Sequence, residues 1–426
     1  MRFIFIAGIN RSGGSLLARL FDGHPKIASY PMEVTYPFCD NSFKFLEKLT
    51  GTPTHIPDFR IGIDPIKYFN IEKEKIFYKL GKETSSKYGI RKNYLEKAFY
   101  EKNIKTNFDY EKYREKLLLY TKNCQNNQEL YEAKHKAYFE SWDEGKNFNN
   151  PNYVVSHDSN GLFLNDFEKY FREFTDSVIF IPIRDCLGYI AAEKTRIARR
   201  YFGSKRFARP VPPNFLVKKF SFYDLDSLII TWNISLSRIK LLKEKFKNNN
   251  RLIIYRLEKL TSNTEEAMKF FSEKIDIEYD QILTKPTIKG ENWLGNSQQG
   301  INSGVNQNPN AYYKKVLRSD EINKILEKTG EISNILKNID EINIDLSKLN
   351  DDHFYDIKNQ RKYINDVNSW SLYCSLGFKG FRKLKLEKPN SMSLIALIFS
   401  LLVKVYHFPR LFKQRYFPGL GKQNYT

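Results

Sequence analysis

The beginning of the chain constrains the fold more than any other stretch. Residues 3–7 (FIFIA) are apolar, aromatic or β-branched, which is typical of a strand buried on both faces of a parallel sheet. A polar loop with glycines follows, and Asp22-Gly23 with Pro25 then end a helical pattern of apolar residues, namely Leu16, Leu17, Leu20 and Phe21. A strand, a loop and a helix in this order predict the first unit of an α/β fold.

The loop between strand and helix, residues 8–15 (GINRSGGS), has the spacing of the phosphate-binding P-loop, but Gly14 occupies the position of the lysine. A nucleoside-triphosphate site needs that lysine, whereas the backbone amides of a helix N-terminus suffice for a smaller anionic group. Arg11 is the cation of this loop, and a guanidinium can bond two oxygens of an anion at once. The alternative is a glycine-rich turn without a ligand. The pattern predicts an anion site formed by Arg11, Ser12, Gly13, Gly14, Ser15 and Leu16.

The same stretch, GINRSGGSLL followed by His24-Pro25 and Glu33, resembles the 5′-phosphosulfate loop of sulfotransferases that use 3′-phosphoadenosine-5′-phosphosulfate (PAPS). The family has threonines at the positions of Gly14 and Ser15. The resemblance implies that the loop binds PAPS and that Arg11 offsets charge growing on the leaving phosphate oxygen. It also implies that Glu33 is the general base that takes the acceptor's proton. The alternative for Glu33 is a surface carboxylate.

A second segment resembles the family's apolar strand that ends in Arg-Asp-Pro. Residues 177–183 (SVIFIPI) predict a buried strand, and Arg184 and Asp185 follow it. The resemblance implies that Arg184 binds the 3′-phosphate of the nucleotide. Where the family has a serine this chain has Ala192, and Arg196 follows one helical turn later as a second cation. The alternative is an ordinary strand that ends in a solvated Arg-Asp pair.

Three further segments resemble family motifs and occur in the family's order. Residues 156–160 (SHDSN), at the end of a short predicted strand, resemble its K-[ST]-P-x-N step without the lysine and proline. Residues 251–255 (RLIIY) predict a strand, and residues 256–260 (RLEKL) after it resemble R-Y-E-D-L. Residues 285–304 (KPTIKGENWLGNSQQGINSG) resemble its late loop, which implies that Asn296 and Ser297 bind the 3′-phosphate. For this last segment the alternative is a flexible surface loop.

Charge and composition leave the partner open. The net charge is +20, with 69 basic and 49 acidic residues, and basic residues gather in segments 194–219 and 377–426. Such patches attract nucleic acid, anionic lipid or a charged nucleotide alike. Residues 391–403 are apolar but too few to span a bilayer, for which about 20 are needed. Residues 391–417 are therefore predicted either to contact a membrane surface or to dock on the domain as a helix.

The cysteines and the start of the chain bear on its compartment. Four cysteines lie far apart without a C-x-x-C pair, so neither a zinc ribbon nor a disulfide framework is indicated. Because the predicted first strand begins at residue 3, we expect no signal peptide before it. We therefore predict a cytoplasmic protein that can associate with a membrane through its basic end.

Helical patterns complete the predicted fold. They lie at residues 222–245, 263–274 and 312–336. Another group falls in an insertion at residues 40–150, which we expect over the carboxyl ends of the sheet. The prediction is a P-loop-type three-layer α/β fold with a central parallel sheet over residues 1–310, followed by a helical, basic extension at 311–426.

The reaction that the resemblance implies moves a sulfuryl group from PAPS to a hydroxyl or amine of an acceptor. The acceptor is expected to be a carbohydrate, a lipid or another small molecule, and the desulfonated nucleotide PAP is the product. Neither a metal nor a nucleic-acid partner is expected. Two other classes stay open. One is a nucleotide or sugar kinase with a degenerate P-loop, which would need a lysine and a carboxylate for magnesium. The other is a non-enzymatic basic protein that binds membranes or nucleic acid.

Overall fold

The computed structural model describes the chain in segments. They are residues 1–33, 112, 115–116, 119–120, 123, 125–141, 151–158, 161–164, 166–202, 214–219, 225–288, 290–293, 304–346 and 349–350. The predicted insertion is therefore described mainly through α7 (Asn127–Glu140), and the predicted extension only up to residue 350.

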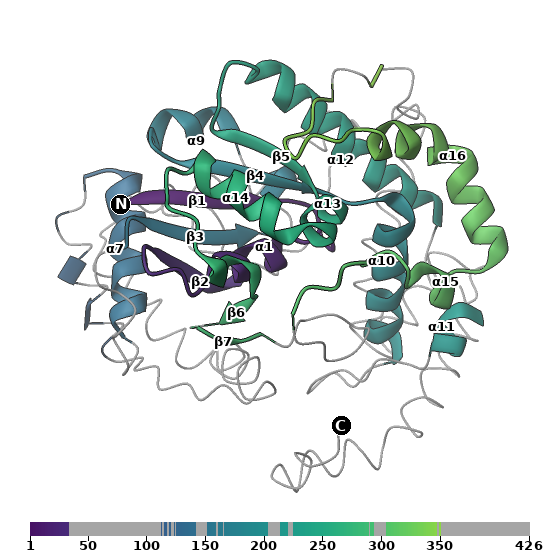
Figure 1. Ribbon diagram of the computed structural model, residues 1–426, viewed down its shortest axis with the longest axis horizontal. Helices are drawn as coiled ribbons and strands as arrows, with labels where there is room; N and C mark the ends of the chain where they lie inside the picture. Colours follow the sequence, from purple (N-terminus) through teal and green to yellow (C-terminus); the bar gives the residue numbers. More distant parts are fainter. Residues whose placement is uncertain are drawn as a thin grey trace, which may run out of the picture.

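Within these segments, five parallel strands form one sheet in the order β2-β3-β1-β4-β5 (Figure 1). The strands are β1 (Arg2–Ala7), β2 (Ile27–Glu33), β3 (Tyr153–Asp158), β4 (Val178–Ile183) and β5 (Leu252–Arg256). Every residue of β3, β4 and β5 is buried, as expected for parallel strands covered on both faces. The predicted α/β fold with a central parallel sheet is confirmed.

Side chains of the central strand β1 alternate between two cores, because successive residues of a strand point to opposite faces. Phe3, Phe5 and Ala7 belong to one apolar cluster, and Ile4 and Ile6 belong to another. Helices therefore cover both faces of the sheet, which gives the three layers that the sequence predicts.

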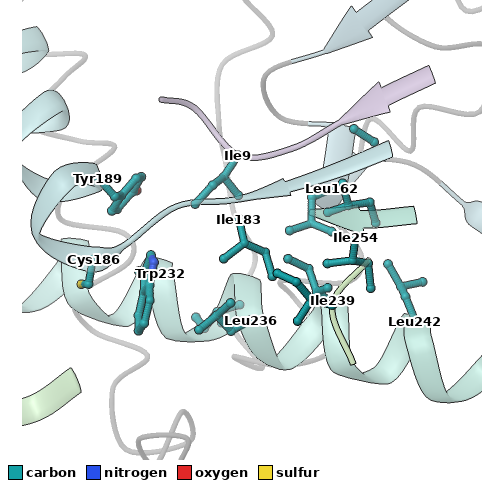
Figure 2. Packing of buried hydrophobic residues seen from close by; sticks show 14 of the residues in the cluster. Ile9, Leu162, Ile183, Cys186, Tyr189, Trp232, Leu236, Ile239, Leu242 and Ile254 are labelled. Carbon is teal, nitrogen blue, oxygen red and sulfur yellow. The ribbon is translucent and has the colours of Figure 1, made fainter. Parts of the chain in front are cut away.

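The two layers of helices differ in size. The helices on the Ile4 side are α1 (Gly14–Phe21), α13 (Leu257–Ser262) and α14 (Thr264–Lys274). Those on the Phe3 side are α7, α8 (Gly161–Leu164), α9 (Phe167–Glu173), α10 (Cys186–Phe202), α11 (Asn214–Lys219), α12 (Leu225–Lys245), α15 (Tyr313–Val316) and α16 (Ser319–Lys337). Figure 2 shows the larger core, where one side of α12 faces strand residues Ile183 and Ile254 through Trp232, Leu236, Ile239 and Leu242.

A short segment after α14 completes the described elements. It consists of the 3₁₀-helix η2 (Gln281–Thr284) and the antiparallel pair of β6 (Thr287–Ile288) and β7 (Glu291–Asn292). Figure 1 shows β6 and β7 below β2 and α1.

The chain leaves neighbouring strands toward opposite faces of the sheet. β1 continues into α1 on one face, whereas its neighbours β3 and β4 continue into α8 and α10 on the other. In open α/β sheets ligands bind at such a point, outside the carboxyl ends of the strands. The loop at residues 8–13 lies there, between β1 and α1.

Helix α7 differs from the expectation for the insertion. Glu132 pairs with the amino group of Met1 (3.3 Å), and the Tyr131 ring lies 5.1 Å from that of Phe3 and 5.4 Å from that of Phe5. These aromatic contacts bury the apolar side of α7 against the face of the sheet, beside the start of β1 (Figure 1). The first half of this helix therefore lies beside the start of β1 and not over the carboxyl ends of the strands, whereas Tyr138 near its end packs with Ile288 and Trp293.

The pattern at residues 312–336, predicted as one helix, forms the two helices α15 and α16. Leu317 between them has an extended backbone (ψ 140°). Arg318 then precedes α16, and its N–H donates to the Glu321 carboxylate (2.8 Å), which is one half of a capping box. This bond fixes the start of α16 after the extended Leu317.

Candidate anion-binding site

Two residues of the loop between β1 and α1 have a left-handed backbone. Gly13 has φ 100°, and a Cβ at this position would lie 2.5 Å from Leu257 Cδ1, so both conformation and space favour glycine. Arg11 has φ 67°, which costs a residue with a side chain about 1–3 kcal/mol. Arg184 Nη1 donates a hydrogen bond to Arg11 O (2.9 Å) and so helps to hold this conformation.

The loop leads into the N-terminus of α1. Ser12 is buried, and its Oγ donates to Ile9 O (2.6 Å), which fixes the turn before the helix. Among the described residues α1 has no side-chain cap, and its first turn carries no acidic residue. The N–H groups at a helix start carry partial positive charge. This end of α1 can therefore receive an anionic group.

A buried carboxylate brings two of the predicted cations together. Glu193 of α10 accepts hydrogen bonds from Arg196 Nε (2.9 and 2.8 Å) and from Arg196 Nη2, and its side chain is 3% exposed. Arg11 Nε lies 3.7 Å from Glu193 Oε1. Glu193 is absent from the sequence prediction, although its place three residues before Arg196 on a helix was a signal for an ion pair.

Arg184 follows β4 and is held by three protein oxygens. Besides Arg11 O, its guanidinium donates to Asn310 Oδ1 (3.2 Å) and Pro309 O (2.8 Å). Burial lowers the pKa of Arg184 to about 10, and the neighbouring Glu258 carboxylate opposes this shift. The side chain therefore keeps its positive charge at neutral pH, beside the backbone of the loop.

The carboxyl end of β3 contributes a histidine, His157, to which the sequence prediction gives no role although it lies in the segment 156–160. The hydroxyl of Ser15 and His157 Nε2 are 3.1 Å apart and hydrogen-bonded. His157 is buried and is the partner of Glu33 in the register of β3 and β2. A polar residue at the end of a buried strand beside β1 was the signal for it. Only the backbone of Glu33 is described, so its role as general base stays a prediction.

The chain before and after Asn296 and Ser297 of the predicted late loop is hydrogen-bonded to residues near α1 and β4. On one side, the Asp22 carboxylate after α1 accepts bonds from Thr287 Oγ1 (2.7 Å) and Gly290 N (3.0 Å). On the other side, Arg184 binds Asn310. Asn296 and Ser297 themselves lie outside the described residues, so their contact with a nucleotide stays a prediction.

Leu16 is the last residue of the predicted anion site, and predictions about metals and membranes concern the rest of the chain. Leu16 is half-buried against the apolar clusters, and its N–H donates to Gly13 O (2.9 Å). The described residues contain no group of three or more His, Cys, Asp or Glu that could hold a metal ion. None of the described helices has the length and apolar character that crossing a membrane requires. The predicted membrane contact at 391–417 lies outside the described part of the chain.

No protein-family model and no curated protein matches the chain. Among solved structures, it is similar to the sulfotransferase domain from the Synechococcus PCC 7002 olefin synthase, with a TM-score of 0.40 and 13% identity over 78% of this chain and 94% of that one. It is also similar to the sulfotransferase domain from the curacin biosynthetic pathway, with a TM-score of 0.37 and 13% identity over 77% of this chain and 97% of that one.

Proposed function

We propose that the chain transfers a sulfuryl group from PAPS to a hydroxyl or amine of an acceptor. The observation that carries the proposal is the loop at the carboxyl end of β1. There a helix N-terminus, the Arg11 side chain and the Arg184 guanidinium lie together, without the lysine that nucleoside-triphosphate sites use.

The loop suits an anionic group. Backbone N–H groups and the dipole of α1 attract an anion, and Ser15 adds a hydroxyl in the first turn. By analogy with phosphoryl transfer, we expect a loose transition state in which catalysis consists of positioning and charge stabilisation. Arg11 would offset the charge that grows on the leaving phosphate oxygen.

The remaining cations suit the 3′-phosphate of the nucleotide. The three bonds of Arg184 to described residues do not use all the N–H groups of a guanidinium. Arg196, which Glu193 holds through its Nε, is a second candidate on the strength of its place one helical turn after Ala192. Asn296 and Ser297 complete the proposed set on the strength of the sequence resemblance.

Two residues are candidates for the proton acceptor. Glu33 has this role in the sequence resemblance, and His157 is its neighbour in the sheet register. His157 is also hydrogen-bonded to Ser15 of the loop. This bond brings His157 near the place proposed for the sulfuryl group of PAPS. The acceptor is proposed to be a carbohydrate, a lipid or another small molecule.

A thermal-shift comparison of PAP, PAPS, ATP with magnesium, and GTP tests the proposal. A nucleotide that binds the folded chain and not the unfolded chain raises the temperature midpoint of unfolding. At about 100 times its Kd it adds about 2.7 kcal/mol to the free energy of unfolding. We expect PAP and PAPS to stabilise the protein more than ATP or GTP. Stabilisation by ATP with magnesium alone would favour a kinase. No response to any nucleotide, together with salt-sensitive binding to anionic vesicles, would favour a non-enzymatic binding protein.

A further inference from the structure

The Arg184 side chain depends on a residue far away in the sequence. Asn310 lies in the segment before α15, and its amide joins two charged groups. Its Oδ1 accepts from Arg184 Nε (3.2 Å), and its Nδ2 donates to Glu258 Oε1 (2.7 Å). Asn310 therefore links the arginine after β4 to a carboxylate at the start of α13.

Glu258 is fixed in turn by the elements around it. Its Oε1 also accepts from the N–H of Asp185 (2.9 Å), directly before α10, and its Oε2 lies 3.6 Å from Arg256 Nε. The amide of Asn310 thus has its acceptor held in place. This holds Asn310 Oδ1 toward Arg184, because the two ends of an amide point in fixed directions.

Gly188 in the first turn of α10 provides the room for this contact. A Cβ at Gly188 would lie 1.9 Å from Asn310 Oδ1, 2.7 Å from Asn310 Cγ and 2.9 Å from Arg184 Nε. Helical backbone does not itself require glycine, and alanine is the better helix former. The absence of a side chain at Gly188 therefore serves the Asn310–Arg184 contact.

We propose that Asn310, given room by Gly188, is a positioning residue that sets Arg184 and, through Arg184, the anion-binding loop. Arg184 Nη1 donates to the carbonyl of Arg11, whose left-handed backbone needs support. A shift of Asn310 moves Arg184 and removes that support. The consequence for nucleotide binding rests on the proposed function, whereas the consequence for the order of the loop does not.

The test compares two substitutions of helical glycines, Gly188→Ala and Gly330→Ala. Gly330 in α16 has nothing within 4 Å of a Cβ, so it is the matched control. Both substitutions favour the helix through propensity. We expect Gly188→Ala, and not Gly330→Ala, to speed amide hydrogen exchange in residues 8–15 by about tenfold or more. We expect the same variant to weaken PAP by about tenfold in calorimetric titration, while Gly330→Ala keeps the affinity of the unchanged chain.

A double-mutant cycle separates positioning from general damage. Asn310→Ala should reproduce the faster exchange and weaker PAP binding of Gly188→Ala. The chain with both substitutions should lose less than the sum of the two single losses, because the amide that the new methyl group would meet at 1.9 Å is gone and only Arg184 Nε, at 2.9 Å, stays close to it. Additive losses, or unchanged exchange in residues 8–15 with Gly188→Ala, would overturn the inference.

The same measurements test the proposed function separately from the positioning role of Asn310. If the unchanged chain and Gly330→Ala do not bind PAP, the proposed function fails. Faster exchange of residues 8–15 in Gly188→Ala would then still support the positioning role. If the unchanged chain binds PAP and Gly188→Ala binds it equally well with an unaltered loop, the positioning role fails and the proposed function stands.

Discussion

At the scale of single residues, Arg11 combines a strained backbone with a side chain directed by a buried carboxylate. Glu193 lies 3.7 Å from its Nε, and Arg184 bonds its carbonyl oxygen. The backbone and the charge of Arg11 therefore have separate supports. Substitutions can test the charge without removing the turn.

Replacing Arg11 by alanine should remove the charge that stabilises the leaving oxygen. Loss of one such group typically lowers kcat by about 10² to 10³. The measurement is the release of PAP from PAPS in the presence of acceptor. Arg11→Lys, which keeps the charge but not the two-pronged geometry, should retain part of the rate. Undiminished turnover of Arg11→Ala would remove this residue from the mechanism.

Glu33 and His157 can be separated as proton acceptors. Glu33→Gln keeps the shape but removes the basicity, so kcat should fall by about 10² to 10⁴ with little change in affinity for PAP. His157→Gln should have the smaller effect on kcat if Glu33 is the base, and the reverse order would assign the proton to His157. A large loss of PAP affinity in Glu33→Gln would contradict the assignment, because a base acting on the acceptor does not hold the leaving nucleotide.

The buried position and hydrogen bonds of His24 predict that the free energy of unfolding depends on pH. Its Nδ1 accepts from the N–H of Lys26 (3.2 Å) and its Nε2 donates to Glu278 O (3.2 Å), a pattern that needs the neutral ring. Burial lowers the pKa of His24 below its ordinary value of 6.5, so the unfolded chain binds the proton more tightly. Stability should be complete above pH 6.5 and should fall as the pH drops through the lower folded pKa. Urea unfolding between about pH 5 and 7 should show this slope, and His24→Gln should flatten it.

At the scale of elements, much of the fold could be predicted because buried strands appear in the sequence as short runs of apolar residues. The strands at 3–7, 177–183 and 251–255 were predicted in this way and are confirmed as β1, β4 and β5. β2 was not predicted, since its sequence IASYPME contains a proline. β2 lies at the edge of the sheet and has a shifted register after Ser29, and an edge strand tolerates proline.

The candidate site could be predicted only in part, because sequence motifs indicate the loop residues but not the side chains from other elements that contact the loop. Arg11, Ser15 and Arg184 stand in recognisable motifs. Glu193 and Asn310 do not. The spacing of Glu193 and Arg196 on a helix indicates their own ion pair, but the approach of Glu193 to Arg11, like the contact of Asn310 with Arg184, forms only when distant elements fold together. Asn310 is bonded to an arginine 126 residues earlier in the chain, and no local pattern announces such a pair.

The turn from β1 into α1 should tolerate no side chain at Gly13. Gly13→Ala would force alanine into φ 100° and its methyl group to 2.5 Å from Leu257 Cδ1. The left-handed backbone alone should cost about 1–3 kcal/mol. Chemical denaturation measures this loss. Adding Leu257→Ala should relieve the clash but not the backbone cost, so recovery to the stability of Leu257→Ala alone would contradict this explanation.

At the scale of the whole molecule, residues beyond 310 take part in the same core as the sheet. Ile325, Ile332 and Leu336 of α16 belong to the apolar cluster that contains Phe3 and α12. The N–H of Ile344 donates to Ile254 O (2.8 Å), so this segment covers the open edge of β5. The predicted domain boundary at residue 310 stays a prediction, but the described residues after it support the helices that carry the site.

A buried ion pair joins α16 to α10, the helix that carries Glu193 and Arg196. Lys194 Nζ lies 2.7 Å from Glu321 Oε2, and the two side chains are 2% and 3% exposed. Removing one partner leaves the other charge buried, so Glu321→Ala should cost about 3–5 kcal/mol in the free energy of unfolding. Glu265→Ala is the control, because Glu265 and Lys269 form an exposed pair, and it should leave the unfolding midpoint nearly unchanged.

The cost of breaking this pair should depend on the charge left behind and not on lost volume. Burial lowers the pKa of Lys194, while Glu321 opposes that shift, so removal of the carboxylate lowers the pKa of Lys194 further. The deficit of Glu321→Ala should therefore shrink as the pH rises and Lys194 loses its proton more readily. Replacing both residues, as in Lys194→Met with Glu321→Leu, should restore most of the stability, because an apolar pair can fill the same space. About 1 kcal/mol should stay lost, because the Arg318 N–H no longer has the Glu321 carboxylate as its acceptor. A deficit that is independent of pH and persists at its full size in the double variant would mean that shape, rather than charge, holds α16 against α10.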